Sequence, residues 1–132
     1  VISAIGTAIT VLLGVREEYG LNEDIASAAA VADVHNVADD LPIPVLLPLL
    51  GRCHSLVSVD TGPAHVAAVL GCPTVALFGV ADPKRFRPGG VSTPVAVLTG
   101  SIGGKPDILG IGPQSVLEAW RQLTAARCQS NG

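Results

Sequence analysis

The chain has 132 residues, of which 48% are hydrophobic and 14% are charged, and its formal net charge is −3 at pH 7. It is too apolar for an intrinsically disordered protein and long enough to fold as one domain, which we expect to span residues 1–132. The acidic balance argues against a nucleic-acid-binding protein, which normally carries a basic face. No apolar run reaches the roughly 18 residues that span a bilayer, so we expect no transmembrane segment.

The three cysteines are odd in number and lack the spacing of a metal site. We therefore expect reduced thiols in a cytoplasmic protein and assign a structural role to the cysteines and to His35 and His54. The apolar start has no basic residues, so we interpret it as leading into a strand and not as a signal peptide. Because the chain begins with Val1 and not with Met, we expect a fragment or a processed piece.

The first part of the chain predicts two strands around one helix. Ala8–Leu13 is rich in β-branched residues and ends at Gly14, which favours a strand, and Asp33–Val37 suits a second, short one. Asn22 is expected to cap the intervening helix. The apolar face of that helix would then consist of Ile25, Ala28, Ala29 and Ala32.

The proline-rich stretch that follows should be irregular between residues 39 and 44. Two prolines remove hydrogen-bond donors there and disfavour the helical conformation of the residues before them. Pro48 would then open a short helix that ends at Cys53, because a helix that began at Pro44 would carry Pro48 in its interior.

The second half of the chain alternates strands and helices. Leu56–Val59 and Thr74–Phe78 are apolar strands, and a helix from Pro63 to Leu70 lies between them, with Gly71 as its stop signal. A basic loop follows at residues 82–90, then a possible edge strand at residues 95–98 and an amphipathic helix at residues 113–127. The apolar face of that last helix would carry Val116, Leu117, Trp120 and Leu123.

This alternation predicts an α/β fold with a Rossmann-like, doubly wound parallel sheet. Ligands of such sheets lie beyond the carboxyl ends of the strands. The segments Asp60–Gly62 and Gly79–Asp82 both follow strands, so both should lie at that edge.

The turn Asp60-Thr61-Gly62 has the geometry of an anion site, because it joins a buried strand to the N-terminus of a helix. The first N–H groups of a helix have no intrahelical partner, and the helix dipole places partial positive charge there. Pro63 at the start of the helix costs nothing, since its missing N–H would have no partner anyway. We therefore expect Thr61 and Gly62 to contact the phosphates of a nucleotide-linked substrate.

Each of these residues also has an ordinary structural interpretation. Gly62 could serve only to supply an unusual backbone angle in a strand–helix turn, and Asp60 could be only the N-cap of the helix. A carboxylate repels a diphosphate, so a ligand contact by Asp60 would be to sugar hydroxyls, or Asp60 would orient the N–H groups of the turn. His65, in the first turn of the helix, could donate to a phosphate or be a structural histidine in a half-buried interface.

The basic loop offers Lys84, Arg85 and Arg87 as possible phosphate contacts, although such residues are usually only solvated. Two other patterns are rejected. Residues 100–105 lack the spacing of a phosphate-binding P-loop, and Ser58 lacks the flanking glycines of a nucleophile elbow.

The segment from Val57 to Gly79 resembles the signature of glycosyltransferase family 9, the heptosyltransferases that build the inner core of lipopolysaccharide. The matching features are Asp60-Thr61-Gly62 followed by His65, the helix of small residues, Gly71-Cys72-Pro73, the apolar strand and Phe78-Gly79. The match is strongest from Val57 to Pro83 and extends over most of residues 8–125.

This resemblance implies the C-terminal, donor-binding half of a GT-B enzyme, with Asp60, Thr61, Gly62, Pro63 and His65 near the diphosphate or the sugar of ADP-heptose or a similar sugar nucleotide. It implies transfer with inversion to a glycolipid or glycan acceptor, without a metal ion or other cofactor. The catalytic base would belong to an N-terminal domain upstream, so no catalytic residue is assigned to this chain. The location would be cytoplasmic, with possible peripheral contact with the inner face of the membrane.

Two other functions remain open on the sequence. The chain could be a non-catalytic module that binds a nucleotide or a sugar nucleotide, or an interaction domain that has kept the fold and lost the ligand. An upstream domain with an acidic base would favour the transferase.

Overall fold

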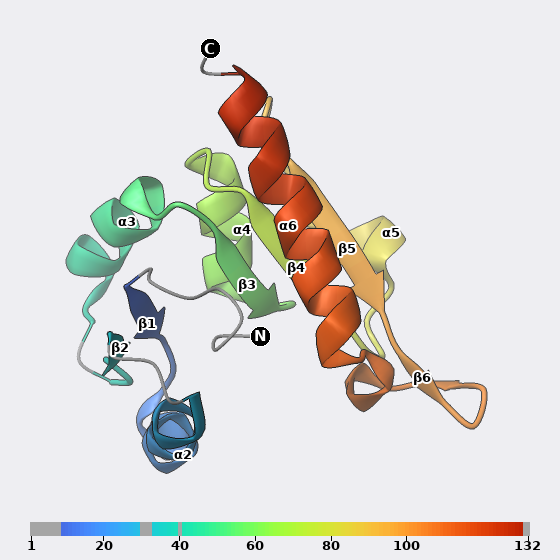
Figure 1. Ribbon diagram of the computed structural model, residues 1–132, viewed down its shortest axis with the longest axis horizontal. Helices are drawn as coiled ribbons and strands as arrows, with labels where there is room; N and C mark the ends of the chain where they lie inside the picture. Colours follow the sequence, from blue (N-terminus) through green and yellow to red (C-terminus); the bar gives the residue numbers. More distant parts are fainter. Residues whose placement is uncertain (1–8, 30–32, 40, 131–132) are drawn as a thin grey trace. The chain divides into compact units, whose positions relative to one another are not determined.

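The computed structural model describes residues 9–29, 33–39 and 41–130 (Figure 1). The chain divides into two compact units, Val1–Leu46 and Leu47–Gly132. Each unit is described by itself, and the single domain expected over residues 1–132 stays a prediction.

The first unit contains two parallel strands with a helix between them. Strand β1 (Thr10–Leu12) pairs with β2 (Val34–Asn36), so that Thr10 lies opposite Val34. A 3-10 turn η1 (Arg16–Glu18) leads directly into α2 (Tyr19–Ala29). Both predicted strands are confirmed within the described residues, which do not include Ala8.

The prediction that Asn22 caps this helix is wrong. Helix α2 begins three residues earlier, and Asn22 lies inside it with only 7% of its surface exposed. Its side-chain amide donates to the carbonyl of Leu13 and to Oδ1 of Asn36, each at 3.2 Å. Ala29, two turns further along, is also buried.

The apolar face predicted for this helix is therefore displaced. Ile25 and Ala28 are exposed, Ala29 is buried as expected, and Ala32 lies outside the described residues. The buried side of α2 includes the polar side chain of Asn22. The pattern of apolar residues alone therefore predicts the wrong side of the helix as buried.

The prediction for the proline-rich stretch is also wrong. Helix α3 (Ile43–Arg52) begins well before Pro48 and carries it in its interior. Pro44 lies in the first turn, where an N–H has no intrahelical partner to lose. Pro48 removes one hydrogen bond, the one to the carbonyl of Pro44. The helix meanwhile buries Leu50 completely, which offsets part of that loss.

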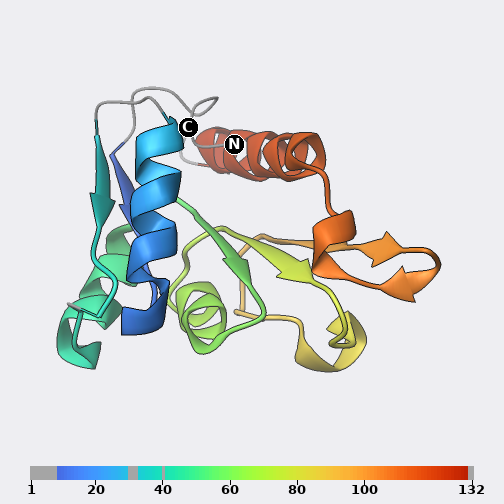
Figure 2. The ribbon, with the colours of Figure 1, turned by 90° about the horizontal axis from the view of Figure 1, so that it is seen from below.

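The second unit is built on a three-stranded parallel sheet in the order β3 (Leu56–Val59), β4 (Thr74–Phe78), β5 (Val95–Thr99). Helix α4 (Gly62–Val69) covers one face, and α6 (Pro113–Ser130) covers the other (Figure 2). This is the doubly wound arrangement that the sequence predicts, and β5 is the expected edge strand.

The core of this unit lies around the central strand. Val75, Ala76 and Phe78 of β4 are completely buried, and α4 contributes small side chains such as Ala64 and Ala67. Small residues let the helix lie close to the sheet. On the opposite face α6 buries Val116, Leu117 and Leu123, while Trp120 is half-buried. Gly71 ends α4 with a φ of 87°, which explains why a glycine is needed there.

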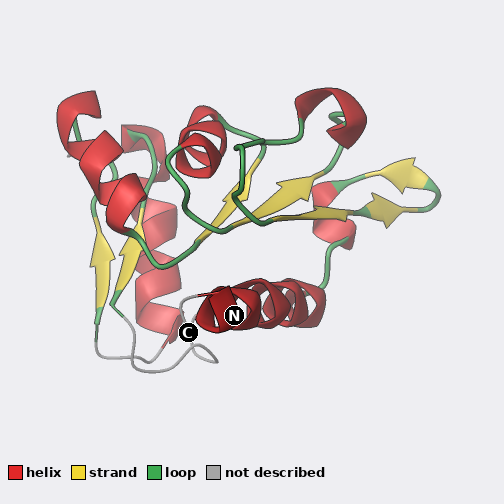
Figure 3. Ribbon diagram, turned by 90° about the horizontal axis from the view of Figure 1, so that it is seen from above, coloured by secondary structure: helices red, strands yellow, loops and turns green. Residues whose placement is uncertain are grey.

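The connections after β4 and β5 are more regular than the sequence predicts. The basic loop contains a short helix α5 (Pro83–Phe86), capped by the carboxylate of Asp82. Residues 100–105 are not a P-loop but belong to a hairpin of β6 (Ser101–Ile102) and β7 (Lys105–Pro106). Gly103 and Gly104 both have positive φ at its turn, which suits a tight hairpin (Figure 3). A 3-10 turn η2 (Ile108–Gly110) follows.

No helix among the described residues combines the length and the apolar character needed to cross a bilayer. The longest, α6, is amphipathic and packs on the sheet.

We expect Trp120→Phe to lower the free energy of unfolding by about 1 kcal/mol, the net worth of one hydrogen bond. The indole Nε1 of Trp120 donates to the hydroxyl of Ser55 at 2.8 Å and so ties α6 to the residue before β3. Urea unfolding of Trp120→Phe, Ser55→Ala and the double variant would measure the coupling. Additive effects of the two changes would contradict this role for the hydrogen bond.

Candidate functional site

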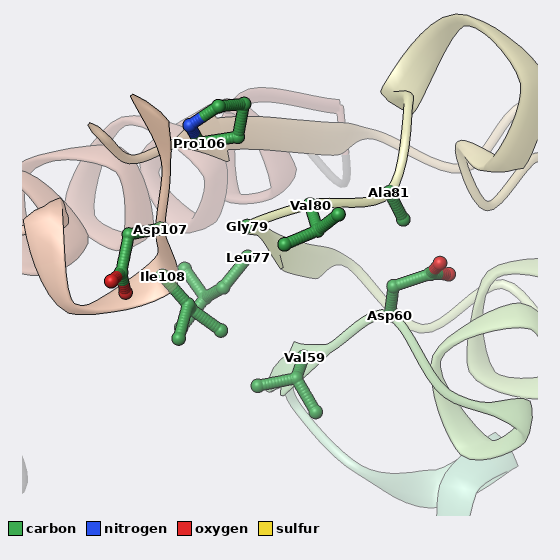
Figure 4. A pocket seen from close by; sticks show the side chains of 9 residues that line it. All are labelled: Val59, Asp60, Leu77, Gly79, Val80, Ala81, Pro106, Asp107 and Ile108. Carbon is green, nitrogen blue, oxygen red and sulfur yellow. The ribbon is translucent and has the colours of Figure 1, made fainter. Parts of the chain in front are cut away.

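The candidate site lies at the carboxyl ends of β3 and β4, where the sequence places it. An open depression of about 390 Å³ is found there. Figure 4 shows that its lining comes from three segments far apart in the sequence. These lining residues are Val59, Asp60, Leu77, Gly79, Val80, Ala81, Pro106, Asp107 and Ile108.

The turn between β3 and α4 leaves the start of the helix accessible. Thr61 is the N-cap, with extended backbone angles (φ −141°, ψ 166°), and its side chain makes no capping bond. Its hydroxyl instead pairs with the hydroxyl of Ser58 at 3.1 Å and donates to the carbonyl of Val59 at 3.3 Å. Gly62 is the first helical residue, so its N–H has no intrahelical partner. Pro63 has no N–H and that of Ala64 donates to the carbonyl of Thr61 at 3.1 Å, so the N–H of Gly62 is the group at this helix start that an anion could use.

Gly62 has no structural reason to be a glycine. Its φ is not positive, so the backbone does not require the conformational freedom of glycine. A Cβ atom added there would meet no heavy atom within 4 Å. The interpretation that Gly62 only supplies an unusual backbone angle is therefore wrong. The absence of a side chain leaves space above the helix N-terminus for a group from outside.

Asp60 is not the N-cap of α4, so that alternative is wrong too. Its Oδ1 lies 3.2 Å from Nε2 of His65. The Asp60 side chain is 22% exposed and that of His65 is 45% exposed, so both are accessible to solvent. Neither group donates to or accepts from a backbone N–H of the turn among the described hydrogen bonds. The contact holds the carboxylate and the imidazole together at the start of the helix.

Pro63 is the second residue of α4 and is half-buried. It follows Gly62 directly. The predicted site residues therefore lie together in the β3–α4 connection and the first turn of α4: Asp60 to Pro63 and His65. Only Asp60 among them lines the depression. Thr61 and Gly62 lie beside it at the helix start.

The three basic residues of the loop do not line the depression. The guanidinium of Arg85 lies 5.7 Å from the centroid of the Phe86 ring. Arg87 donates through Nη2 to the carbonyl of Val95 at 2.9 Å, at the amino end of β5 and so away from the carboxyl edge. Lys84 is exposed on α5. Phosphate contact by any of the three stays a prediction.

The third wall of the depression, formed by Pro106, Asp107 and Ile108, is not among the residues predicted from the sequence. The carboxylate of Asp107 accepts from the backbone N–H of Leu109 at 2.9 Å and so caps η2. A Cβ added to Gly79 would lie 2.8 Å from the backbone nitrogen of Ile108, so glycine there permits this close approach. An Asp before an apolar run is a recognisable cap signal. Its position beside β4 depends on the hairpin, which the sequence analysis did not predict.

The structural role assigned to the cysteines and to His35 and His54 stays a prediction. Cys72 is buried, and partial burial raises the pKa of the Cys53 thiol, which lowers its reactivity at neutral pH. The side chain of Cys128 lies outside the described residues. Within the described part of the chain, no three His, Cys, Asp or Glu side chains gather into a group that could hold a metal ion.

Comparison with known proteins identifies the family. Residues 3–106 match the model of glycosyltransferase family 9 (heptosyltransferase). The chain belongs to glycosyltransferase family 9. The resemblance seen in the sequence is thereby confirmed, and it includes the strand, turn and helix that form the candidate site.

Two curated relatives from Escherichia coli are similar to the chain. Lipopolysaccharide heptosyltransferase 3 is 29% identical over 73 residues, which cover 55% of this chain and 22% of the relative. Lipopolysaccharide heptosyltransferase 2 from strain K12 is 28% identical over 126 residues, which cover 86% of this chain and 36% of the relative. The chain thus spans about a third or less of the length of these relatives.

Solved structures of the family have the same fold. E. coli ADP-heptose LPS heptosyltransferase II superimposes with a TM-score of 0.75 at 30% identity, over 90% of this chain and 37% of that one. The family 9 glycosyltransferase from Veillonella parvula DSM 2008 gives a TM-score of 0.73 at 22% identity, over 89% of this chain and 37% of that one. The α/β fold expected from the GT-B resemblance is confirmed.

Proposed function

We propose that this chain is the donor-binding part of a heptosyltransferase and that its donor is a sugar nucleotide, with ADP-heptose favoured. Family membership supports the reaction class. The choice of donor rests on a similar protein, the E. coli heptosyltransferase II, whose name specifies ADP-heptose.

The diphosphate would bind at the N-terminus of α4. The observation that carries this assignment is Gly62, which sits at an open helix start without any conformational or packing need for glycine. The backbone N–H of Gly62 and the helix dipole can stabilise a phosphate there without a charged side chain. They would also stabilise the negative charge that develops on the departing nucleoside diphosphate.

The sugar would occupy the depression beside that helix start. The lining contains two carboxylates, of Asp60 and Asp107, and no Lys, Arg or His side chain. Such a surface repels a diphosphate but suits a neutral polyol, because carboxylates accept hydrogen bonds from hydroxyl groups. Apolar side chains such as Val80 and Ile108 lie between the two carboxylates (Figure 4) and can contact the C–H face of a sugar ring.

The rest of the reaction is carried over from the family resemblance as part of the proposal. The acceptor would be a lipopolysaccharide-type glycan, transfer would invert the anomeric carbon, and no metal ion would be needed. This chain spans about a third of the length of its relatives. The catalytic base would come from a part of the enzyme that lies outside this chain. Donor binding that is unchanged by EDTA is the expected result for a metal-independent site.

Isothermal titration calorimetry with ADP-heptose, ADP and GDP-mannose tests the proposal. ADP-heptose should bind more tightly than ADP, since it fills both the helix start and the depression, and GDP-mannose should bind more weakly. Equal affinities for ADP and ADP-heptose would favour a nucleotide-binding module without a sugar site. Absence of binding by all three would contradict the donor-binding role.

A further inference from the structure

Thr61 occupies the capping position of α4 without capping the helix through its side chain. Its backbone has the extended angles of an N-cap residue, and threonine is one of the preferred residues at that position. A capping hydroxyl would accept from the N–H of Ala64, because Pro63 has no N–H to offer. The N–H of Ala64 instead donates to the carbonyl of Thr61. The Thr61 hydroxyl is therefore directed away from a bond that its backbone conformation would allow.

The hydroxyl of Ser58 helps to hold the Thr61 hydroxyl in this orientation. The two hydroxyl oxygens lie 3.1 Å apart, and Oγ1 of Thr61 also lies 3.3 Å from the carbonyl oxygen of Val59. Both distances exceed the value of about 2.7–2.8 Å that is typical of O–H···O bonds, so neither contact alone holds the Thr61 side chain firmly. Ser58 is itself anchored, since its hydroxyl donates to the same carbonyl at 2.9 Å. The three oxygens together turn the Thr61 side chain back toward β3.

A hydroxyl that capped α4 would lie in the path of a phosphate. Capping side chains and bound anions compete for the same space at the start of a helix. The N–H of Gly62 is available at this start, and Gly62 has no side chain of its own to cover it. While the Thr61 hydroxyl is held against the strand, the approach to that N–H stays clear.

Ser58 itself is not part of the depression. It is a half-buried residue of β3 and does not contribute to the lining. We propose that Ser58 is a positioning residue, which keeps the Thr61 side chain from capping α4 and so leaves the Gly62 N–H open to the diphosphate of the donor. The inference rests on the proposed function, because it requires the diphosphate to bind at this helix start.

Two substitutions of the same shape test the role of the Ser58 hydroxyl. Valine and threonine are both β-branched and suit a strand, but only threonine keeps the hydroxyl. Ser58→Val should weaken the binding of ADP and of ADP-heptose by the same factor, about tenfold, which is the lower value for one hydrogen bond to a charged group. Ser58→Thr should bind both ligands within about twofold of the wild type, as measured by isothermal titration calorimetry of the full chain. Equal losses in the two variants would mean that only the shape of the strand matters and would overturn the inference.

The orientation of the Thr61 side chain can be measured without any ligand. Three-bond NMR couplings of Thr61 in isotopically labelled protein report its χ1 rotamer. Ser58→Val should move Thr61 to a different rotamer, and Ser58→Thr should leave it where it is in the wild type. An unchanged rotamer in Ser58→Val would contradict the positioning role whatever the affinities are.

A second background shows whether Ser58 acts through Thr61. Thr61→Ala has no hydroxyl that could cap the helix, so adding Ser58→Val to it should cause no further loss of ADP affinity. A further tenfold loss in the double variant would show that Ser58 acts by another route and would sink the proposal.

These outcomes are distinct from a failure of the proposed function. A wild type that binds neither ADP nor ADP-heptose would overturn the donor site and this inference together. A wild type that binds both, with full affinity retained in Ser58→Val, would overturn the role of Ser58 alone.

Discussion

Gly62→Val is expected to weaken the binding of both ADP and ADP-heptose at least tenfold while leaving the fold nearly unchanged. A hydrogen bond to a charged group is worth about 1.5–3 kcal/mol, or roughly 10-fold to 150-fold in affinity. The valine side chain would occupy the space through which a phosphate reaches the Gly62 N–H at the start of α4. The backbone tolerates the change, since φ is not positive and no heavy atom lies within 4 Å of the new Cβ. Calorimetric titration and a thermal unfolding scan measure the two effects.

Gly112→Val provides a control in a similar position. Gly112 precedes α6, its carbonyl accepts from the N–H groups of Ser115 and Val116, and its Cβ would also meet nothing within 4 Å. This variant should lose some stability and keep its nucleotide affinity. Gly62→Ala, with a smaller side chain, should lie between the wild type and Gly62→Val. Wild-type affinity in Gly62→Val would exclude the helix start as the phosphate site.

The segment from Leu56 to Phe78 is predicted correctly because each local signal there agrees with the fold. The signals are two apolar strands, a proline just inside the helix and a glycine just after it, and all of them predict the observed order of strand, helix and strand. The same segment carries the family signature. A short run of residues therefore indicates the fold and the family, and it also contains the residues of the candidate site.

The errors arise where packing overrides a local preference. The burial of Leu50 accompanies a helix that runs through Pro48, although proline propensity predicts a break. Asn22 has the residue type of a cap but is buried inside α2, where its amide bonds with Leu13 and Asn36. Neither outcome follows from residue types alone, because both depend on partners distant in the sequence.

The candidate site likewise contains some residues that can be predicted from the sequence and one that cannot. Asp60, Thr61 and Gly62 can be found from one stretch of sequence, since the strand, turn and helix that place them are continuous. Asp107 cannot be found in this way. It reaches the depression only because β5 and the hairpin return the chain beside Gly79.

On the proposed donor assignment, the contact between Asp60 and His65 would keep the sugar and the phosphate sites apart. The carboxylate lines the depression, and the imidazole, 3.2 Å away, lies in the first turn of the helix. In that assignment Asp60 would face hydroxyl groups while His65 would face the more negative part of the donor.

Asp60→Asn is expected to reduce ADP-heptose affinity by about 10-fold to 100-fold, the worth of hydrogen bonds to a charged group, and to leave ADP affinity unchanged or slightly higher. Asparagine has the same shape, and it can still pair with His65, so the turn should be preserved. The loss is confined to the sugar because only hydroxyl groups depend on the negative charge, whereas a diphosphate is repelled by it. Calorimetric titrations of both ligands give the ratio of affinities directly. A parallel loss for ADP and ADP-heptose would instead mean that Asp60 acts by orienting the turn, and His65→Gln should then reproduce it.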